Sequence, residues 1–326
     1  MLKNMRAKRN FPDLTLQPDL GLTPLPPREA TTARLFNGAE RPAPARASKI
    51  IVGDAEAEMR ALPSESVRMC VTSPPYWGLR DYQLPRDLQI GAEDKLDDYI
   101  RRLVRVFQEV KRILQPDGTL WLNLGDSYTS GNRTWRAPDR KNPAREMEYR
   151  APTPEGLKPK DLIGVPWRVA FALQSAGWYL RSDIVWYKPN CQPESVKDRP
   201  TQSHEYLFLL SKSLKYRYNA SAILEQATDS KGNRNRRSVW SIPTEPFPEA
   251  HFATFPRALV EPCVLAGSDP GDTVLDPFLG AGTVGLVCNS LQRAFVGIEI
   301  SRDYAGIAAR RTGVSLDEAD EPDSAP

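Results

Sequence analysis

Cysteine and histidine are scarce in this sequence. Its 326 residues include four cysteines and two histidines, and no two cysteines form a CxxC pair. Such a spacing gives neither a disulfide framework nor the ligand set of a zinc site, so we expect no bound metal. The four cysteines are Cys70, Cys191, Cys263 and Cys288.

Long apolar runs are missing as well. No stretch of about 18 apolar residues marks a membrane span, and the basic N-terminus is not followed by the apolar segment of a secretion signal. The chain has 40% hydrophobic and 26% charged residues, which is typical of a globular domain. We therefore expect a soluble, cytoplasmic protein that does not bind a membrane.

A strong net charge is also absent. The formal charge is +3 at pH 7, which is too small to indicate nucleic-acid binding by itself. Charged residues of one sign instead cluster in short segments. Residues 314–326 form a tail with five acids and no base, whereas Lys231, Arg234, Arg236 and Arg237 gather in one short polar segment. Any basic surface for a polyanion is therefore expected to be a local patch.

The apolar pattern predicts one large α/β domain. Residues 1–48 contain seven prolines and little periodicity, which indicates a flexible arm. Residues 49–313 alternate between β-rich runs and helical patterns, and their C-terminal part repeats as βαβα units, which predicts a Rossmann-like sheet. Segments near 127–160 and 189–250 are rich in proline and charge, so we expect inserted loops there, followed after 313 by the acidic tail.

Individual elements follow from the periodicity. The predicted strands are residues 49–53, 67–72, 119–124, 178–188, 204–211, 273–275 and 294–298, and the predicted helices are residues 96–114, 161–175, 255–266, 282–292 and 301–311. The helix 96–114 is expected to stop at Pro116-Asp117-Gly118, and the strand 204–211 is a candidate for a hairpin with residues 215–218.

A glycine-rich turn follows the predicted strand 273–275. Asp276 stands at the end of that strand, and Gly280 and Gly282 allow a tight turn and a close approach of a ligand to the backbone. Glu299 ends the next strand, where a carboxylate can accept hydrogen bonds from both hydroxyls of a ribose. The alternative is a plain turn whose glycines serve packing, but the strand, the helix and Glu299 together favour a nucleoside site.

The type of cofactor follows from what this turn lacks. The sequence has neither the full G-x-G-x-x-G spacing of a nicotinamide site nor a Walker lysine. It carries Asp276 ahead of the turn instead, where a carboxylate can hold the amino end of a methionine. S-adenosylmethionine therefore fits this turn better than a nicotinamide dinucleotide.

A second turn, Thr72-Ser73-Pro74-Pro75-Tyr76-Trp77, follows the predicted strand 67–72. Two prolines fix the backbone, so the Ser73 side chain and the Pro74 carbonyl can be aimed at one amino group. Holding both N–H donors of an exocyclic amine pulls its nitrogen out of conjugation with the ring and exposes the lone pair to a methyl sulfonium. Tyr76 can stack on a base flipped out of the duplex, and Trp77 can extend that wall. A rigid turn with buried aromatic residues is the alternative.

These residues resemble a known family, the amino-methylating DNA methyltransferases. Ser73-Pro74-Pro75-Tyr76 is similar to the (Ser/Asp/Asn)-Pro-Pro-(Tyr/Phe) catalytic motif, and the turn from Asp276 to Thr283 is similar to the cofactor motif. The catalytic motif comes first here, as in the permuted β group of that family. The resemblance spans residues 50–311, and it implies a methyltransferase sheet with a circularly permuted motif order and target-recognition segments in the inserted loops.

The resemblance implies further cofactor contacts. His251-Phe252-Ala253-Thr254-Phe255-Pro256 looks like the segment that closes over the methionine end of the cofactor. Asp54 would follow the third strand of the permuted sheet and lie near the adenine, although a turn-forming Gly53-Asp54 pair is an equal alternative. The expected cofactor-binding residues are Asp54, Phe255, Asp276, Pro277, Phe278, Gly280, Gly282, Thr283 and Glu299.

The resemblance also implies the substrate. Serine at the first motif position tends to accompany methylation of cytosine N4, and aspartate that of adenine N6. We therefore expect site-specific methyl transfer to N4 of a flipped cytosine in double-stranded DNA, with adenine N6 as the alternative. A prokaryotic or phage origin and a cognate restriction endonuclease that acts separately are further expectations.

DNA contacts are expected from Trp77, Arg234, Arg236 and Arg237. A second basic group surrounds Trp135 and consists of Arg133, Arg136, Arg140, Lys141 and Arg145. For each of these basic residues a solvated charged loop is an equal alternative.

Other chemistries are less consistent with the sequence. Methylation of cytosine C5 needs a thiolate, and Pro262-Cys263 supplies a suitable dipeptide, but it lies in the helical pattern 255–266, so we expect Cys263 to be a small buried residue, like Cys70 in its strand. An amide or RNA methyltransferase can share a Pro-Pro-Tyr turn, and an inactive DNA-binding regulator can share the fold. Ser73, the motif order and two intact turns favour a DNA methyltransferase.

Overall fold

The computed structural model describes residues 47–79, 82, 84–130, 135, 149–227, 232–245 and 255–317. The strands are β1 (Lys49–Val52), β2 (Val67–Thr72), β3 (Leu114–Leu124), β4 (Tyr179–Tyr187), β5 (His204–Ser211), β6 (Glu225–Gln226), β7 (Asn233–Arg234), β8 (Val239–Ser241), β9 (Thr273–Asp276), β10 (Ala294–Glu299) and β11 (Leu316–Asp317). The helices are α1 (Ala55–Ala61), α2 (Leu96–Ile113), α3 (Val165–Ser175), α4 (Arg257–Gly267), α5 (Thr283–Ser290) and α6 (Arg302–Thr312).

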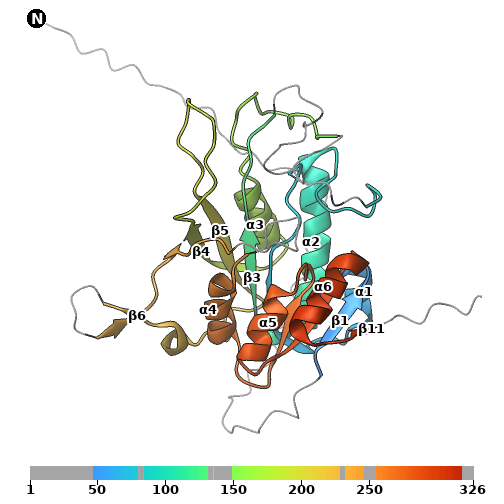
Figure 1. Cartoon of the computed structure of the whole chain (residues 1–326), viewed down its shortest axis with the longest axis vertical. Helices are drawn as coiled ribbons and strands as arrows, with labels where there is room; N and C mark the ends of the chain where they lie inside the picture. Colours follow the sequence, from blue (N-terminus) through green and yellow to red (C-terminus); the bar gives the residue numbers. More distant parts are fainter. Residues whose placement is uncertain are drawn as a thin grey trace, which may run out of the picture. The chain divides into compact units, whose positions relative to one another are not determined.

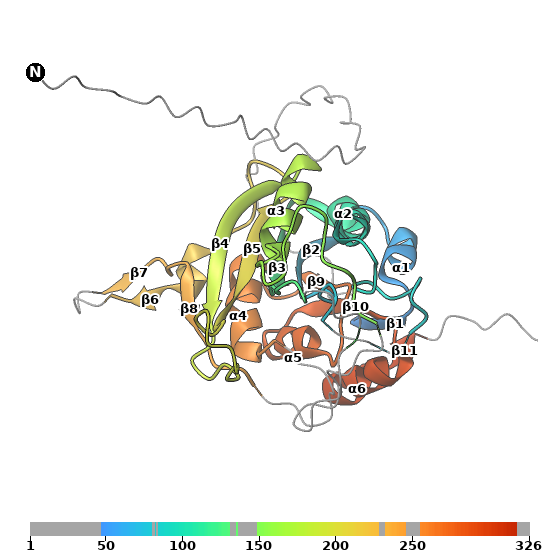
Figure 2. The same cartoon turned by 90° about the horizontal axis from the view of Figure 1, so that it is seen from above.

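One mixed sheet organises these elements (Figure 1). Its strand order is β11-β1-β10-β9-β2-β3-β5-β4-β8, which can be followed in Figure 2. Parallel pairing runs from β11 to β3, and β5 lies antiparallel between β3 and β4. Strands β6 and β7 form a separate ribbon. The central strands β9 and β10 are short apolar runs buried on both faces, as parallel strands covered by helices must be.

Helices cover both faces of the sheet (Figure 2). Helices α1, α2 and α3 pack in sequence on one face, and α4, α5 and α6 on the other. Helix α2 packs on the sheet through an apolar face. Leu103, Phe107 and Val110 recur at helical spacing and are fully buried, whereas Arg101 and Arg105 are exposed to solvent. The core on the other face joins Trp121 of the sheet to Val260 and Cys263 of α4.

The order of the strands in the sheet differs from their order along the chain, and this difference indicates where a ligand binds. Strand β9, near the C-terminus, pairs with β2, near the N-terminus, through Met69↔Val274 and Cys70↔Leu275. From this pair the sheet continues through β10 on one side and β3 on the other. The strand order reverses between β9 and β2, and ligands of open α/β sheets bind at the carboxyl ends of strands beside such a reversal.

Most predicted elements are present, and two predictions are wrong. Strand β3 begins at Leu114 and not at Thr119 as predicted, so it includes the turn-forming residues Pro116-Asp117-Gly118. A shift of register in its pairing with β2, between Val67 and Met69, accommodates these residues. Residues 215–218 form no hairpin with β5, because both edges of β5 are already paired, with β3 and with β4. Helix α1 and the short strands β8 and β11 were not predicted.

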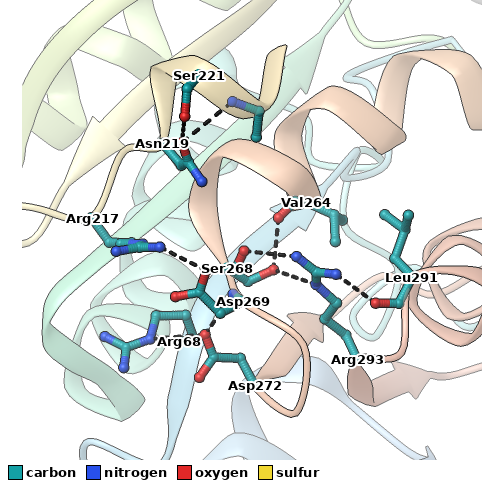
Figure 3. Close-up of polar contacts among 11 residues, drawn as sticks. Arg68, Arg217, Asn219, Ser221, Val264, Ser268, Asp269, Asp272, Leu291 and Arg293 are labelled. Carbon is teal, nitrogen blue, oxygen red and sulfur yellow. Dashed lines mark hydrogen bonds and ion pairs between the residues drawn. The ribbon is translucent and has the colours of Figure 1, made fainter. Parts of the chain in front are cut away.

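A polar cluster ties the amino-terminal ends of the central strands together, away from the carboxyl ends (Figure 3). The buried Arg293 guanidinium, just before β10, donates to the Ser268 carbonyl at 2.9 Å and to its hydroxyl at 3.3 Å. Arg68 of β2 pairs with Asp272 at 3.3 Å, and Arg217 pairs with Asp269 at 2.6 Å. These contacts join the turn between α4 and β9 to β2 and to the chain after β5, so this end of the sheet serves structure.

Candidate active site

The predicted glycine turn lies at the carboxyl end of β9. Gly280 and Gly282 have φ angles of 51° and 81°, a left-handed conformation that glycine adopts without strain. A Cβ on Gly282 would also lie 2.9 Å from the Ala308 Cβ of α6. Any larger residue would therefore strain the turn and push α6 away, so both glycines fix the path of the backbone at the start of α5.

Glu299 closes this turn from the end of β10. Its carboxylate accepts hydrogen bonds from the Gly280 N–H at 2.8 Å and from the Ser301 N–H at 2.9 Å. Burial raises the pKa of Glu299. Each carboxylate oxygen retains a second lone pair, so the side chain is held in one orientation and can still accept a hydrogen bond from a ligand hydroxyl.

Asp276 links the cofactor turn to the second predicted turn. Its Oδ1 atom accepts hydrogen bonds from the Thr72 hydroxyl at 2.6 Å and from the Phe278 N–H at 3.1 Å. The residue is 1% exposed, and burial raises its pKa to about 7, with the charge of Glu299 adding to the effect. A buried carboxylate of this kind is stabilised by a cation, which an S-adenosylmethionine ammonium or sulfonium provides, so the residues present fit that cofactor.

The Ser-Pro-Pro-Tyr turn extends from the carboxyl end of β2, beside Asp276. The Tyr99 hydroxyl of α2 donates to the Pro75 carbonyl at 2.9 Å, which anchors the turn from below. The Tyr76 ring lies against Gly125, where a Cβ would approach the Tyr76 Cε2 atom to 2.6 Å. Only glycine leaves room for the ring there, so the turn and the chain after β3 fit together.

Sequence reasoning also missed Asn123 of β3 and Glu205 of β5, whose side chains contact the polar groups of Ser73 and Tyr76. The Asn123 amide nitrogen lies 3.3 Å from the Ser73 hydroxyl, 2.8 Å from the Tyr76 hydroxyl and 2.9 Å from a Glu205 carboxylate oxygen. The Tyr76 hydroxyl donates to the same Glu205 oxygen at 2.8 Å. The available signal was a polar residue beside an apolar run, with Asn123 near the carboxyl end of β3 and Glu205 near the start of β5.

Glu205 is ionised in this setting. Burial raises its pKa, but the charge of Lys188 and hydrogen bonds from Lys188, Asn123 and Tyr76 outweigh that effect, so its pKa lies below the ordinary value. Lys188 contacts the second carboxylate oxygen, and its ammonium lies 4.3 Å from the centre of the Trp186 ring.

Other predicted cofactor residues lie around the two turns. Pro277 and Thr283 are buried within the glycine turn, and Phe278 is half-buried. Asp54 caps α1 by accepting the Ala57 N–H at 3.0 Å, and it borders a cavity of about 310 Å³. Phe255 lines a small pocket together with Thr72 and Asn123. Residues 251–254 of the predicted closing segment lie outside the described residues.

Trp77 is not placed as expected. It is 4% exposed, and its indole N–H donates to the Glu93 carbonyl at 2.9 Å. The ring therefore packs inside the protein beside the turn, and a contact between Trp77 and DNA is not available in this conformation. The prediction that Trp77 extends the aromatic wall of Tyr76 took the two neighbouring side chains to face the same way, whereas Trp77 is buried and Tyr76 is only half-buried.

Cys263 and Cys70 are buried, as expected from their places in a helix and a strand. The Cys263 thiol donates to the Leu259 carbonyl at 3.2 Å within α4, and both side chains are 0% exposed. Burial raises the pKa of each thiol. Neither side chain is positioned as the thiolate that methylation of a ring carbon requires.

The basic residues expected to contact DNA are partly engaged with neighbours. Arg234 and Arg237 both donate to Glu225 Oε1, at 2.9 Å and 3.1 Å. The Arg236 guanidinium lies 4.4 Å from the centre of the Trp240 ring. Lys231 and the basic residues on either side of Trp135, at 133, 136, 140, 141 and 145, lie outside the described residues.

The sheet order, the glycine turn and the adjoining Ser-Pro-Pro-Tyr turn together define an S-adenosylmethionine-dependent methyltransferase. The sequence profile of the family described as DNA methylase matches residues 67–310. The chain belongs to this family of N6/N4 amino DNA methyltransferases. The expected fold and enzyme class, and S-adenosylmethionine as the cofactor, are therefore confirmed.

The chain is similar along most of its length to Type II methyltransferases. It is 63% identical over 267 residues to M.SmaI of Serratia marcescens, covering 82% of this chain and 91% of that protein. It is 63% identical over 259 residues to M.Cfr9I of Citrobacter freundii, covering 79% of this chain and 85% of that protein. The chain is accordingly a Type II DNA methyltransferase.

Solved structures show the same fold. The putative DNA modification methylase TTHA0409 of Thermus thermophilus, complexed with S-adenosyl-L-methionine, is 26% identical and covers 84% of this chain and 100% of its own, with a TM-score of 0.56. The cytosine-N4-specific PvuII DNA methyltransferase is 19% identical and covers 85% of this chain and 90% of its own, with a TM-score of 0.61.

Two further observations concern ligands and membranes. Within the part of the chain that the structure describes, no group of three or more His, Cys, Asp or Glu side chains is arranged to hold a metal ion. Among the same residues, no helix has both the length and the apolar composition needed to cross a membrane.

Proposed function

We propose that this enzyme transfers a methyl group to N4 of a cytosine flipped out of double-stranded DNA. The observation that carries the proposal is the hydrogen bond of 2.6 Å between Thr72 and Asp276, which joins the end of β2 to the cofactor turn and brings Ser73 next to it. Serine at the first motif position tends to accompany cytosine N4 methylation in this family. Adenine N6 is the second candidate, because the same acceptors suit either amine.

The chemistry at this turn needs no enzyme nucleophile. When bound, S-adenosylmethionine supplies an electrophilic methyl group. The Ser73 hydroxyl oxygen and the Pro74 carbonyl accept the two N–H bonds of the target amine, which directs its lone pair out of the ring plane. Methyl transfer would break the methyl–sulfur bond as the nitrogen–carbon bond forms, so that the cofactor would leave as the uncharged thioether S-adenosylhomocysteine and the methylated amine would release its extra proton to solvent. Tyr76 offers the aromatic face on which the flipped base stacks.

The cofactor site is proposed to extend over three strand ends. Asp276 would hold the amino end of the methionine, and Glu299 would accept the ribose hydroxyls through its remaining lone pairs. Asp54, at the end of β1, would lie near the adenine. Phe255, together with Pro277, Phe278, Gly280, Gly282 and Thr283, would complete the enclosure.

Identification of the product tests the proposed function. Purified protein is incubated with labelled S-adenosylmethionine and mixed-sequence duplex DNA, and the digested nucleosides are analysed by mass spectrometry. N4-methylcytosine is expected. N6-methyladenine would contradict the choice of base and leave the geometry of amine capture intact. Incorporation of no label into DNA, with cofactor binding demonstrated, would contradict duplex DNA of ordinary sequence as the substrate.

The proposed catalytic domain consists of residues 49–313, preceded in the sequence by the N-terminal arm and followed by the acidic tail. Its inserted segments near 127–160 and 189–250 are proposed to recognise the target DNA sequence. The described parts of the two inserts touch each other. The Arg199 guanidinium lies 3.7 Å from the centre of the Tyr128 ring, and Lys160 pairs with Asp198 at 2.7 Å. A surface built from both segments can read one DNA site, which a separate restriction endonuclease would share.

Replacing Arg236 and Arg237 together with alanine is expected to weaken DNA binding and to flatten its dependence on salt. Each phosphate contact that is lost removes about 0.9 from the slope of log K against log salt. The Arg237 side chain is 61% exposed, and Arg236 is held over Trp240, so both positions suit phosphates. Fluorescence anisotropy with a labelled duplex at several salt concentrations measures the slope.

The control removes the same charge elsewhere. Arg60 of α1 and Arg101 of α2 are exposed residues whose side chains are 67% and 44% accessible. Their double alanine variant is expected to keep the wild-type slope. An unchanged slope in the Arg236 and Arg237 variant would remove the β7–β8 segment from the DNA-binding surface.

A further inference from the structure

A chain of polar contacts runs from Ser73 into the protein, away from the cofactor turn. Ser73 lies 3.2 Å from the Tyr76 hydroxyl, Tyr76 lies 2.8 Å from Glu205, and Glu205 contacts the Lys188 ammonium. The Glu205 and Lys188 side chains are 16% and 18% exposed. Three separate segments, the turn after β2, the start of β5 and the end of β4, thus meet beneath the residue proposed to hold the target amine.

The direction of each hydrogen bond in this chain follows from donor counts. Glu205 is ionised and can only accept, so the single Tyr76 hydroxyl hydrogen points to it. Tyr76 then has no hydrogen left for Ser73. In the contact of 3.2 Å between the two hydroxyls, Ser73 must therefore be the donor and Tyr76 the acceptor.

Asn123 favours the same directions of the hydrogen bonds. Its amide nitrogen faces the Ser73 hydroxyl, the Tyr76 hydroxyl and Glu205, at 3.3 Å, 2.8 Å and 2.9 Å. The opposite orientation of the amide would place its oxygen 2.9 Å from a carboxylate oxygen, which is repulsive. Asn123 can therefore only donate to the two hydroxyls, and it cannot draw the Ser73 hydrogen away from Tyr76.

Ser73 is left with a defined role. Its one hydrogen is directed at Tyr76, so its remaining lone pair faces away from the chain of contacts and is available as an acceptor. A freely rotating serine can equally donate, and a donor facing an amine would compete for the nitrogen lone pair that must attack the methyl group. The direction imposed by Glu205 prevents this.

We propose that Glu205, held by Lys188, is a positioning residue that orients the Ser73 hydroxyl through Tyr76 so that Ser73 presents only an acceptor to the target amine. This inference rests on the role proposed above for Ser73. Glu205 orients rather than takes the amine proton, because Lys188 and the hydrogen-bond donors around it favour its ionised form.

The test replaces Glu205 with glutamine, which keeps the shape and removes the charge. We expect the single-turnover rate of methyl transfer, at saturating cofactor and DNA, to fall by about tenfold or more, with the Kd for S-adenosylmethionine within about twofold of wild type. The rate ratio of the two proteins should be constant across pH, since no proton ends on Glu205. Glu109→Gln removes a carboxylate paired with Arg112 on α2 and is the matched control; its rate should equal that of wild type.

A double-mutant cycle with Tyr76→Phe separates orientation from a general effect on folding. If Glu205 acts through the Tyr76 hydroxyl, adding Glu205→Gln to Tyr76→Phe should slow the reaction little further. Multiplicative losses would overturn the proposal, as would a Glu205→Gln rate within about twofold of wild type or a loss confined to cofactor affinity. A fully active Ser73→Ala enzyme would instead contradict the role proposed for Ser73, and a methylated nucleoside other than N4-methylcytosine would contradict the proposed function, so these failures are distinguishable.

Discussion

Replacing Ser73 with alanine is expected to lower the rate of methyl transfer by about 100- to 1000-fold, the range found when one hydrogen-bonding group is removed from a reacting centre. The variant loses an acceptor for the target amine, so the lone pair is no longer directed at the methyl group. Cofactor affinity should change little, because the contact between Thr72 and Asp276 does not involve Ser73. Single-turnover transfer of labelled methyl groups measures the rate, and calorimetry measures the affinity.

A matched serine provides the control. Ser221 lies at the other end of the sheet, where its hydroxyl donates to the Asn219 side chain at 2.6 Å (Figure 3). Ser221→Ala should methylate DNA at the wild-type rate. Full activity in Ser73→Ala would remove Ser73 from the reaction, and a loss of cofactor affinity as large as the loss of rate would move its role to the cofactor site.

Replacing Asp276 with asparagine is expected to weaken S-adenosylmethionine binding by about 10- to 100-fold, which corresponds to losing one hydrogen bond to a charged group. Asparagine keeps the shape and an oxygen for Thr72 and Phe278, so the change isolates the charge. Titration calorimetry measures the affinity, and Asp183→Asn on the exposed face of β4 is the control. Unaltered binding would show that Asp276 does not hold the cationic end of the cofactor.

The affinity of the wild-type enzyme for its cofactor should depend on pH near neutrality. Burial raises the pKa of Asp276 to about 7, so the carboxyl is protonated below that pH and ionised above it. A cationic ligand favours the ionised form, so affinity should rise between about pH 5.5 and 7.5, with a proton released on binding. The Asp276→Asn variant should lack this part of the profile, and a profile shared by both proteins would contradict the assignment.

The same carboxyl should cost stability when no ligand is bound. Its pKa is raised above the ordinary value of about 3.9, so folding favours the protonated form, and its contribution to the free energy of unfolding falls as pH rises from about 4 to about 7. Asp276→Asn should therefore be more stable than wild type at pH 8, by at most about 4 kcal/mol, and this difference should shrink towards pH 4. Chemical denaturation at several pH values measures it.

The parts of the fold that the sequence predicts well are those with a local cause. The ends of β2 coincide with the predicted strand because an apolar run is followed directly by Ser73-Pro74-Pro75, which cannot continue a ladder. Helix α2 is nearly complete in the prediction because its apolar stripe is long. Helix α1 spans only Ala55–Ala61, too short for a periodic signal, and the capping role of Asp54 was not predicted.

The parts of the site that sequence reasoning missed have a tertiary cause. Asn123 and Glu205 are 82 residues apart and meet because β5 inserts antiparallel next to β3, a pairing that apolar periodicity does not specify. Lys188 joins them only because β4 pairs with the other edge of β5. The two motifs could be predicted because each turn consists of consecutive residues. The residues that contact Ser73 and Tyr76 come instead from separate strands.

The pairing of β2 with β9 has a consequence for synthesis of the protein on the ribosome. Strand β2 emerges early, but its partner across Cys70↔Leu275 is translated some two hundred residues later. Until then one edge of β2 has no neighbour, and pairings between distant segments form slowly. The nascent chain must therefore keep an apolar strand edge soluble until β9 has been made, and no methylating activity can arise before the glycine turn has left the ribosome.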